Sequence, residues 1–300
     1  MKRKRPGRTT KRGRGIYLLP NLFTTAALFA GFFAVIVAMK GDFQAAAIGI
    51  LVAMILDGLD GRVARLTNTA TDFGKEYDSM SDMVSFGLAP ALVVYQWGAQ
   101  MMAGLPLGAW GRIGWLAAFF YTVAAALRLA RFNSHTDTTN GHYFQGLPSP
   151  SAAGLVGSSL WLATDLGLEG PLVLAGAFAL TIFAGGCMVS NFPYRSFKDY
   201  DMVNRVGFRH LLLIPVMFII IAADPPLLLT CIFMVYAISG PILYLWKRMR
   251  GMPLDLPTVA WFNDRIKKDT AADNDDVREH DEPLDRHDAQ DIDSSGTHER

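Results

Sequence analysis

Charged side chains are scarce in this chain of 300 residues, at 18% of the sequence against roughly 25% in an ordinary soluble domain. The few charges are also unevenly placed. Eight of the 28 basic residues precede residue 15, and 12 of the 27 acidic residues lie in 269–300. The long middle of the chain is apolar, which argues against a soluble enzyme, and the net charge of +1 only averages the two ends.

Cysteine is also nearly absent. The two that occur, Cys187 and Cys231, both lie inside apolar runs. This excludes a disulfide scaffold and a cysteine-rich zinc site, and it favours two small buried apolar side chains.

Long apolar stretches are abundant, and eight of them approach the 20 residues that cross a hydrocarbon core of about 30 Å. They occupy approximately 17–39, 43–63, 83–103, 112–131, 151–167, 171–190, 207–223 and 226–246. The first is too long for a removable signal peptide and lacks a small-residue cleavage site, so we expect it to remain as a helix. The weakest are 151–167 and 207–223, which gives a range of six to eight spans.

The distribution of lysine and arginine supports the count of eight, because cytoplasmic loops retain these residues and short translocated loops lose them. With the N-terminus inside, the cytoplasmic segments up to residue 250 contain 20 basic residues, and the opposite side contains only Lys40 and Arg112. The sequence therefore predicts an all-α, polytopic helix bundle in the cell membrane with both termini in the cytoplasm.

The two ends of the chain are expected to be separate from the membrane domain of 16–250. A basic head of 1–15 could serve as a nucleic-acid arm, but a basic segment directly before a span more typically binds anionic headgroups, so we expect no nucleic-acid partner. Residues 251–300 are expected to form a cytoplasmic, largely disordered acidic tail, since 269–300 has almost no large apolar side chains.

Acidic residues cluster where the second span ends, in DGLDGRVARLTNTATDFGKEYDSMSDMVSFG at 57–87. Asp57 and Asp60 are three residues apart and Asp78 and Asp82 four apart, so each pair lies on one face of a helix. An acidic side chain inside a span costs about 2.5–3.5 kcal/mol, so a cation must offset these charges. Carboxylate oxygens suit Mg²⁺ or Mn²⁺, and two ions about 3.5–4 Å apart can share four carboxylates.

Small residues and an arginine accompany the acids. Gly61 and Gly74 lack the side chain that would keep a bulky ligand away from the helix backbone. Ala64 is small on the same side, and Arg65 can offer a fork of donors to a phosphate. The ordered set D-x2-D-G-x2-A-R-x8-G-x3-D-x3-D therefore indicates a site for a phosphate-bearing nucleotide, rather than solvated acids on an ordinary helix–loop–helix.

This set resembles the signature of the CDP-alcohol phosphatidyltransferases, integral membrane enzymes that move a phosphatidyl group from a CDP-linked lipid onto an alcohol and release CMP. Outside the signature, 125–132, 145–154 and 190–198 resemble the CDP-diacylglycerol–serine O-phosphatidyltransferase branch, so the likeness covers roughly 16–246. The resemblance implies a six-helix core with about two further transmembrane helices. It also implies CDP-diacylglycerol and L-serine as substrates, and it leaves room for a homodimer.

The resemblance assigns a role to each acid. Asp57 and Asp78 would bridge two metal ions, Asp60 would complete one metal site, and Asp82 would complete the other. Asp82 would also take the proton from the acceptor hydroxyl on the cytoplasmic side. The CDP moiety would be surrounded by Gly61, Ala64, Arg65, Thr71 and Gly74, with Asn21 and Thr24 either as further contacts or as a helix cap and a packing residue.

The acceptor pocket is less defined by the sequence. A zwitterionic amino acid needs a cation for its carboxylate and an acceptor for its ammonium group. Candidates for the cation are Arg128, Arg131, Arg195 and Lys198, and the candidate for the acceptor is Glu76. Each of them also has a simpler interpretation, as a charge that sets the topology or lies on the surface.

Two other functions remain open. A sister transferase would use glycerol 3-phosphate or inositol in place of serine. A divalent-cation transporter would also gather carboxylates, but on broken helices near the bilayer centre, where a glycine–arginine pattern has no use.

Overall fold

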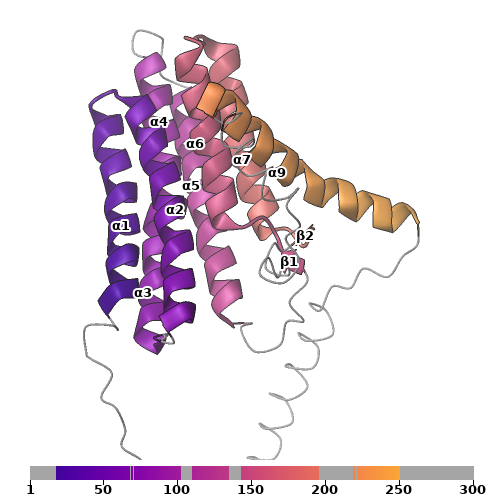
Figure 1. The fold of residues 1–300 in the computed structure, drawn as a ribbon. Helices are drawn as coiled ribbons and strands as arrows, with labels where there is room; N and C mark the ends of the chain where they lie inside the picture. The colour runs from indigo at the N-terminus through magenta and orange to yellow at the C-terminus, as the bar shows by residue number, and fades with distance from the viewer. Residues whose placement is uncertain are drawn as a thin grey trace, which may run out of the picture. The chain divides into compact units, whose positions relative to one another are not determined.

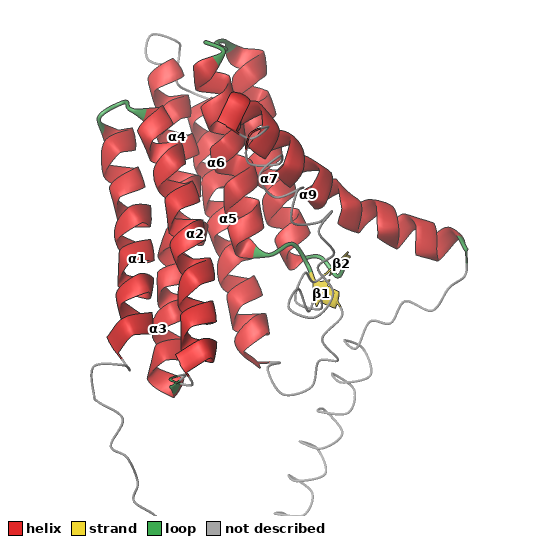
Figure 2. Ribbon diagram, in the orientation of Figure 1, coloured by secondary structure: helices red, strands yellow, loops and turns green. Residues whose placement is uncertain are grey.

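The computed structural model describes residues 18–67, 69, 71–102, 110–134, 143–195, 219 and 222–250. The basic head, the acidic tail and most of the expected span 207–223 lie outside this set. The described chain is a bundle of helices with one small pair of strands (Figures 1 and 2).

Five helices in the described part are long and apolar enough to cross a membrane, and they confirm five of the expected spans. They are α1 (Leu18–Met39), α2 (Phe43–Thr67), α5 (Trp110–Ser134), α7 (Pro171–Val189) and α9 (Pro225–Met249). The protein is therefore an all-α, multi-pass membrane protein.

Two more expected spans are also helical. At 83–103 the chain forms a π-helical segment, η2 (Met83–Leu88), followed by α4 (Ala89–Met101). The short helix α3 (Asp72–Asp82) runs directly into η2, so helical backbone is continuous from Asp72 to Met101. At 151–167 the chain forms α6 (Ser149–Asp165), a helix of 17 residues.

Small residues bring α1 close to the segment that follows α3. A Cβ added to Gly31 would lie 2.7 Å from the Cα of Ser85 in η2, so only glycine fits at this crossing. The Ser85 hydroxyl donates to the Ala27 carbonyl at 3.2 Å, and the Ser81 hydroxyl donates to the Thr24 carbonyl at 3.2 Å. Close backbone approach with hydrogen bonds between helices is typical of packing in a bilayer, where lipid removes the hydrophobic drive for helix association.

The η2 segment is also attached to α5. Tyr121 is fully buried, and its hydroxyl donates to the Phe86 carbonyl at 3.0 Å. Because η2 starts at the residue after Asp82, its contacts with α1 and α5 fix the end of α3 within the bundle.

A short antiparallel ribbon connects the later helices. Strand β1 (Tyr143–Gln145) pairs with β2 (Pro193–Arg195) and leads directly into the start of α6. The buried Tyr194 hydroxyl donates to the Ala237 carbonyl of α9 at 2.8 Å. Figure 1 shows α9 slanting away from the upright helices, and this ribbon lies beside it.

We expect Gly31→Ala to lower the thermal unfolding temperature in detergent, because the new methyl group overlaps Ser85 and overpacking typically costs about 1–3 kcal/mol. Gly186→Ala in α7 is the matched control, since a Cβ there meets no atom within 4 Å. Both changes gain about the same helix propensity, so equal unfolding temperatures for the two variants would contradict the close crossing.

Candidate active site

Four acidic side chains from two helices meet at the end of the bundle. Asp57 and Asp60 lie inside helix α2, which continues past the expected end of its span to Thr67. Carboxylate oxygens of Asp57, Asp60 and Asp78 lie within 4.8 Å of one another, and Asp82 contacts Asp57. The convergence expected from the i, i+3 and i, i+4 spacings is therefore present.

Hydrogen bonds within the protein satisfy this group only in part. Oδ2 of Asp60 accepts from the Thr24 hydroxyl at 2.8 Å. Oδ1 of Asp78 and Oδ1 of Asp82 are enclosed and accept no hydrogen bond from the described residues. Burial, together with the neighbouring Asp60 and Asp57, raises the pKa of Asp78 from its ordinary value to about 7. Enclosed carboxylate oxygens that accept no hydrogen bond are suitable ligands for a hard divalent cation.

The turn between α2 and α3 has a local explanation. Thr71 is the N-cap of α3, and its hydroxyl accepts from the Gly74 amide at 3.0 Å. Ahead of it, the hydroxyls of Thr67 and Thr69 are hydrogen-bonded at 2.7 Å. The chain therefore reverses within a few residues and places the second acidic pair opposite the first.

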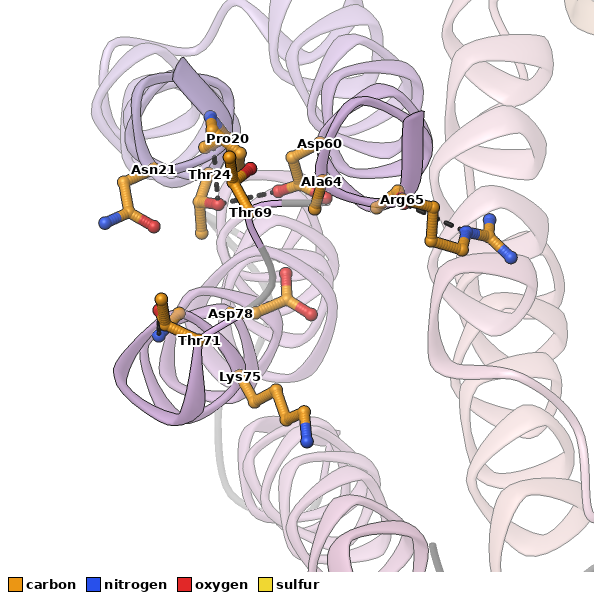
Figure 3. Close-up of a pocket in the computed structure, with 12 residues that line it drawn as sticks. Pro20, Asn21, Thr24, Asp60, Ala64, Arg65, Thr69, Thr71, Lys75 and Asp78 are labelled. Carbon is orange, nitrogen blue, oxygen red and sulfur yellow. Dashed lines mark hydrogen bonds between the residues drawn. The ribbon is translucent and has the colours of Figure 1, made fainter. Parts of the chain in front are cut away.

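A cavity of about 200 Å³ opens on one side of the acids, between the start of α1, the end of α2 and α3 (Figure 3). Its lining is Pro20, Asn21, Thr24, Asp60, Gly61, Ala64, Arg65, Thr69, Thr71, Gly74, Lys75 and Asp78. Every residue that the sequence assigned to the nucleotide is in this lining. Asp57 and Asp82 are not, so the cavity meets only half of the carboxylate group.

The two signature glycines differ in what surrounds them. A Cβ at Gly61 would meet no atom within 4 Å, because this position faces open space in the cavity. At Gly74 a Cβ would come within 3.1 Å of the Thr71 hydroxyl. Arg65 lines the cavity, but Figure 3 shows its guanidinium turned away from Asp78, and its Nε donates to the Gly61 carbonyl at 3.0 Å.

The two residues from α1 differ in what they contact. Asn21 lines the cavity beside Gly74. Thr24 is buried, and its hydroxyl also lies 3.2 Å from the Pro20 carbonyl while it donates to Asp60. Thr24 thus contacts one of the four acids directly, a role that the sequence did not indicate.

The candidate acceptor residues are separated by the fold. Arg128 in α5 lies near Asp82 and Asp57, and its Nη1 donates to the Ser149 hydroxyl at 2.6 Å. Arg131, one turn later, donates to the Asn191 side chain and to the Val189 carbonyl, so it joins α5 to the end of α7. Glu76 is exposed on α3. The side chain of Arg195 and all of Lys198 lie outside the described residues.

Sequence reasoning missed three polar residues of this region. Lys75 and Thr69 line the cavity, and Ser149 holds Arg128. Lys75 directly follows the signature glycine Gly74, so the sequence could have predicted that it lies near the cavity. Thr69 and Ser149 gave no comparable signal, because their proximity to the site depends on tertiary packing.

Comparison of the sequence with known proteins identifies its relatives. The model of the CDP-alcohol phosphatidyltransferase family matches residues 17–185. A CDP-diacylglycerol–serine O-phosphatidyltransferase of Helicobacter pylori (strain ATCC 700392 / 26695) is 36% identical over 237 residues, which is 78% of this chain and 94% of the relative. An archaetidylserine synthase of Methanothermobacter thermautotrophicus is 35% identical over 142 residues, covering 47% of this chain and 56% of the relative. The chain belongs to the CDP-alcohol phosphatidyltransferase family.

Proposed function

We propose that this protein transfers the phosphatidyl group of CDP-diacylglycerol to the hydroxyl of L-serine, giving phosphatidylserine and CMP. The observation that carries the proposal is the meeting of four signature carboxylates beside a cavity lined by the signature glycines. The names of the relatives support serine as the acceptor. The lysine and arginine distribution supports a site that faces the cytoplasm.

The carboxylate group fits a divalent cation, Mg²⁺ or Mn²⁺, and four carboxylates are enough for two ions. Asp57 and Asp78 would touch both ions, Asp60 would complete one site and Asp82 the other. Bound cations would neutralise the diphosphate and the leaving CMP. Thr24 would hold Asp60 in place through its 2.8 Å hydrogen bond, as partners of metal ligands commonly do.

The cavity between α1, α2 and α3 would hold the CDP moiety. Gly61 and Gly74 let the nucleotide approach the backbone, and Lys75 and Arg65 supply positive charge at its rim. Both cationic side chains are exposed, so each can turn toward a phosphate when the nucleotide binds.

Asp82 would act as the base for transfer. The serine oxygen forms a new bond to the phosphatidyl phosphorus, the bond from that phosphorus to the CMP oxygen breaks, and the serine proton passes to the Asp82 carboxylate. Asp82 suits this role because it lies outside the lining of the nucleotide cavity but contacts Asp57 within the carboxylate group.

The acceptor is tested by incubating the purified protein with CDP-diacylglycerol, Mn²⁺ or Mg²⁺, and one alcohol at a time while CMP release is followed. We expect release with L-serine and little release with glycerol 3-phosphate or inositol. Release with one of the latter alone would identify a sister transferase. Ion uptake into vesicles without CMP release would identify a transporter.

We expect Asp57→Ala and Asp78→Ala to abolish turnover and to weaken the response to metal, because each carboxylate would touch both ions. Turnover is measured as CMP release across a Mn²⁺ titration. Asp165→Ala is the control, since this acid is exposed at the far end of α6. Unchanged activity at unchanged metal concentration in either site variant would refute the two-metal arrangement.

Asp82→Asn keeps the side-chain shape but removes the basic oxygen. Loss of a general base commonly costs about 10²–10⁴-fold in rate, and the amide is also a weaker metal ligand, so we expect a loss at or beyond the upper end. Affinity for CDP-diacylglycerol in Mn²⁺ should change far less. A rate loss below about tenfold would place the base elsewhere, and an equal collapse of affinity would make Asp82 mainly a metal ligand.

A further inference from the structure

The carboxylate group has a second side, opposite the nucleotide cavity. Asp60 and Asp78 line the cavity, whereas Asp57 and Asp82 lie nearest to Arg128 of α5. Arg128 itself is not among the residues that line the cavity. A molecule that reacts at Asp82 without displacing the nucleotide has to approach from the side of Arg128.

The donors of Arg128 are only partly used. Its Nη1 donates to the hydroxyl of Ser149, which is fully buried. Its Nε is enclosed and has no hydrogen-bond partner among the described residues. Within the described part of the chain, no carboxylate oxygen comes within the 4 Å of an ion pair with Arg128. A guanidinium presents five donors in a fixed fork, so this side chain keeps donors for another acceptor.

The charge of Arg128 leads to the same expectation. Its nearest acids, Asp57 and Asp82, are those that cations would occupy during the proposed reaction. Once their charge is neutralised by metal, the guanidinium has no anion left to offset its own charge in a poorly hydrated place. A negatively charged group on the incoming substrate would provide the missing anion.

The start of α6 adds a second positive feature. Ser149 is the first residue of this 17-residue helix, and no side chain caps the helix N-terminus. Pro148 and Pro150 have no amide hydrogen, so the donors in this first turn are the amides of Ser149 and Ser151, and the helix dipole adds to them in favouring a negative charge. The hydrogen bond from Arg128 to Ser149 joins the two features into a single cradle.

We infer that Arg128, positioned by Ser149 at the start of α6, binds the carboxylate of the amino-acid acceptor beside Asp82 and thereby selects an amino acid over other alcohols. The inference rests on the proposed transfer to serine and deepens it. Arg131 has a different task, because it is bonded to Asn191 and to the Val189 carbonyl. One arginine with a helix N-terminus suits a single carboxylate, and Asp82 then lies within the reach of the short serine side chain.

The test compares L-serine with L-serinamide, which keeps the hydroxyl and the amine but lacks the negative charge. For the wild type we expect kcat/KM to favour serine. For Arg128→Gln we expect the KM for serine to rise about ten- to hundredfold, as loss of a charged hydrogen bond implies, with a smaller change in kcat. The preference for serine over serinamide should fall toward one, while the affinities for CDP-diacylglycerol and Mn²⁺ stay near wild type.

Two further variants separate recognition from structure. Arg128→Lys keeps the charge but loses the fork, so it should retain part of the preference for serine. Ser149→Ala should raise the KM for serine less than Arg128→Gln does. Arg112→Gln is the matched control, because it removes the same charge from an exposed site at the other end of α5 and should leave both acceptors unaffected.

Serine binding is also measured by calorimetry in the presence of Mn²⁺ and CMP, which needs no turnover. An Arg128→Gln protein that is folded and binds serine as the wild type does, or that keeps the wild-type preference over serinamide, would overturn the inference. If Arg128→Gln does not fold, the test is the preference of Arg128→Lys for serine over serinamide. A preference equal to that of the wild type would overturn the inference. Wild-type release of CMP with glycerol 3-phosphate and not with serine would instead overturn the proposed acceptor.

Discussion

Mutual repulsion among four carboxylates is the constraint on which the rest of this structure depends. Asp57, Asp60, Asp78 and Asp82 are gathered at the end of two helices, and two of them keep enclosed oxygens that accept no hydrogen bond from the described part of the chain. In a membrane protein such an arrangement is costly unless cations are bound. The fold must therefore hold the acids together in the interval before cations and substrate arrive.

Several neutral hydrogen bonds provide this restraint. Thr24 donates to Asp60, and Ser81 and Ser85 attach the end of α3 and the start of η2 to α1. Tyr121 attaches η2 to α5 from the other side. These donors carry no charge, so they hold the acids in place without neutralising the carboxylates, as a lysine or arginine in competition with the cations would do. Restraint and charge balance are thus assigned to different residues.

Much of this arrangement could be predicted from the sequence, because hydropathy and i, i+4 spacing are local properties. They predicted the spanning helices and the paired acids, whereas the residues that line the cavity were predicted from the signature pattern and the family that it resembles. The π-helical register of η2 was not predictable, since a shift in backbone hydrogen bonding leaves no mark in composition. The β1–β2 ribbon was missed because three-residue strands are too short to show alternation.

The limit of prediction from a single sequence is clearer for the arginines proposed to bind the acceptor. Arg128 and Arg131 are one turn apart in an apolar helix and were equivalent candidates in the sequence. Their partners, Ser149 and Asn191, follow much later in the chain, and only folding brings them to different arginines. Contacts over such distances in the chain have no local periodicity, so a single sequence cannot separate the two roles.

The length of α6 has a consequence for how the protein meets the bilayer. A helix of 17 residues rises about 25 Å, less than a hydrocarbon core of about 30 Å. Most of its residues from Ser149 to Leu160 are buried by other helices, so lipid does not have to thin around it. The 25-residue helices α2, α5 and α9 are long enough to tilt in a thinner membrane. Hydrophobic mismatch is thereby borne by helices that face lipid, and the helix that starts beside Arg128 is shielded from changes in membrane thickness.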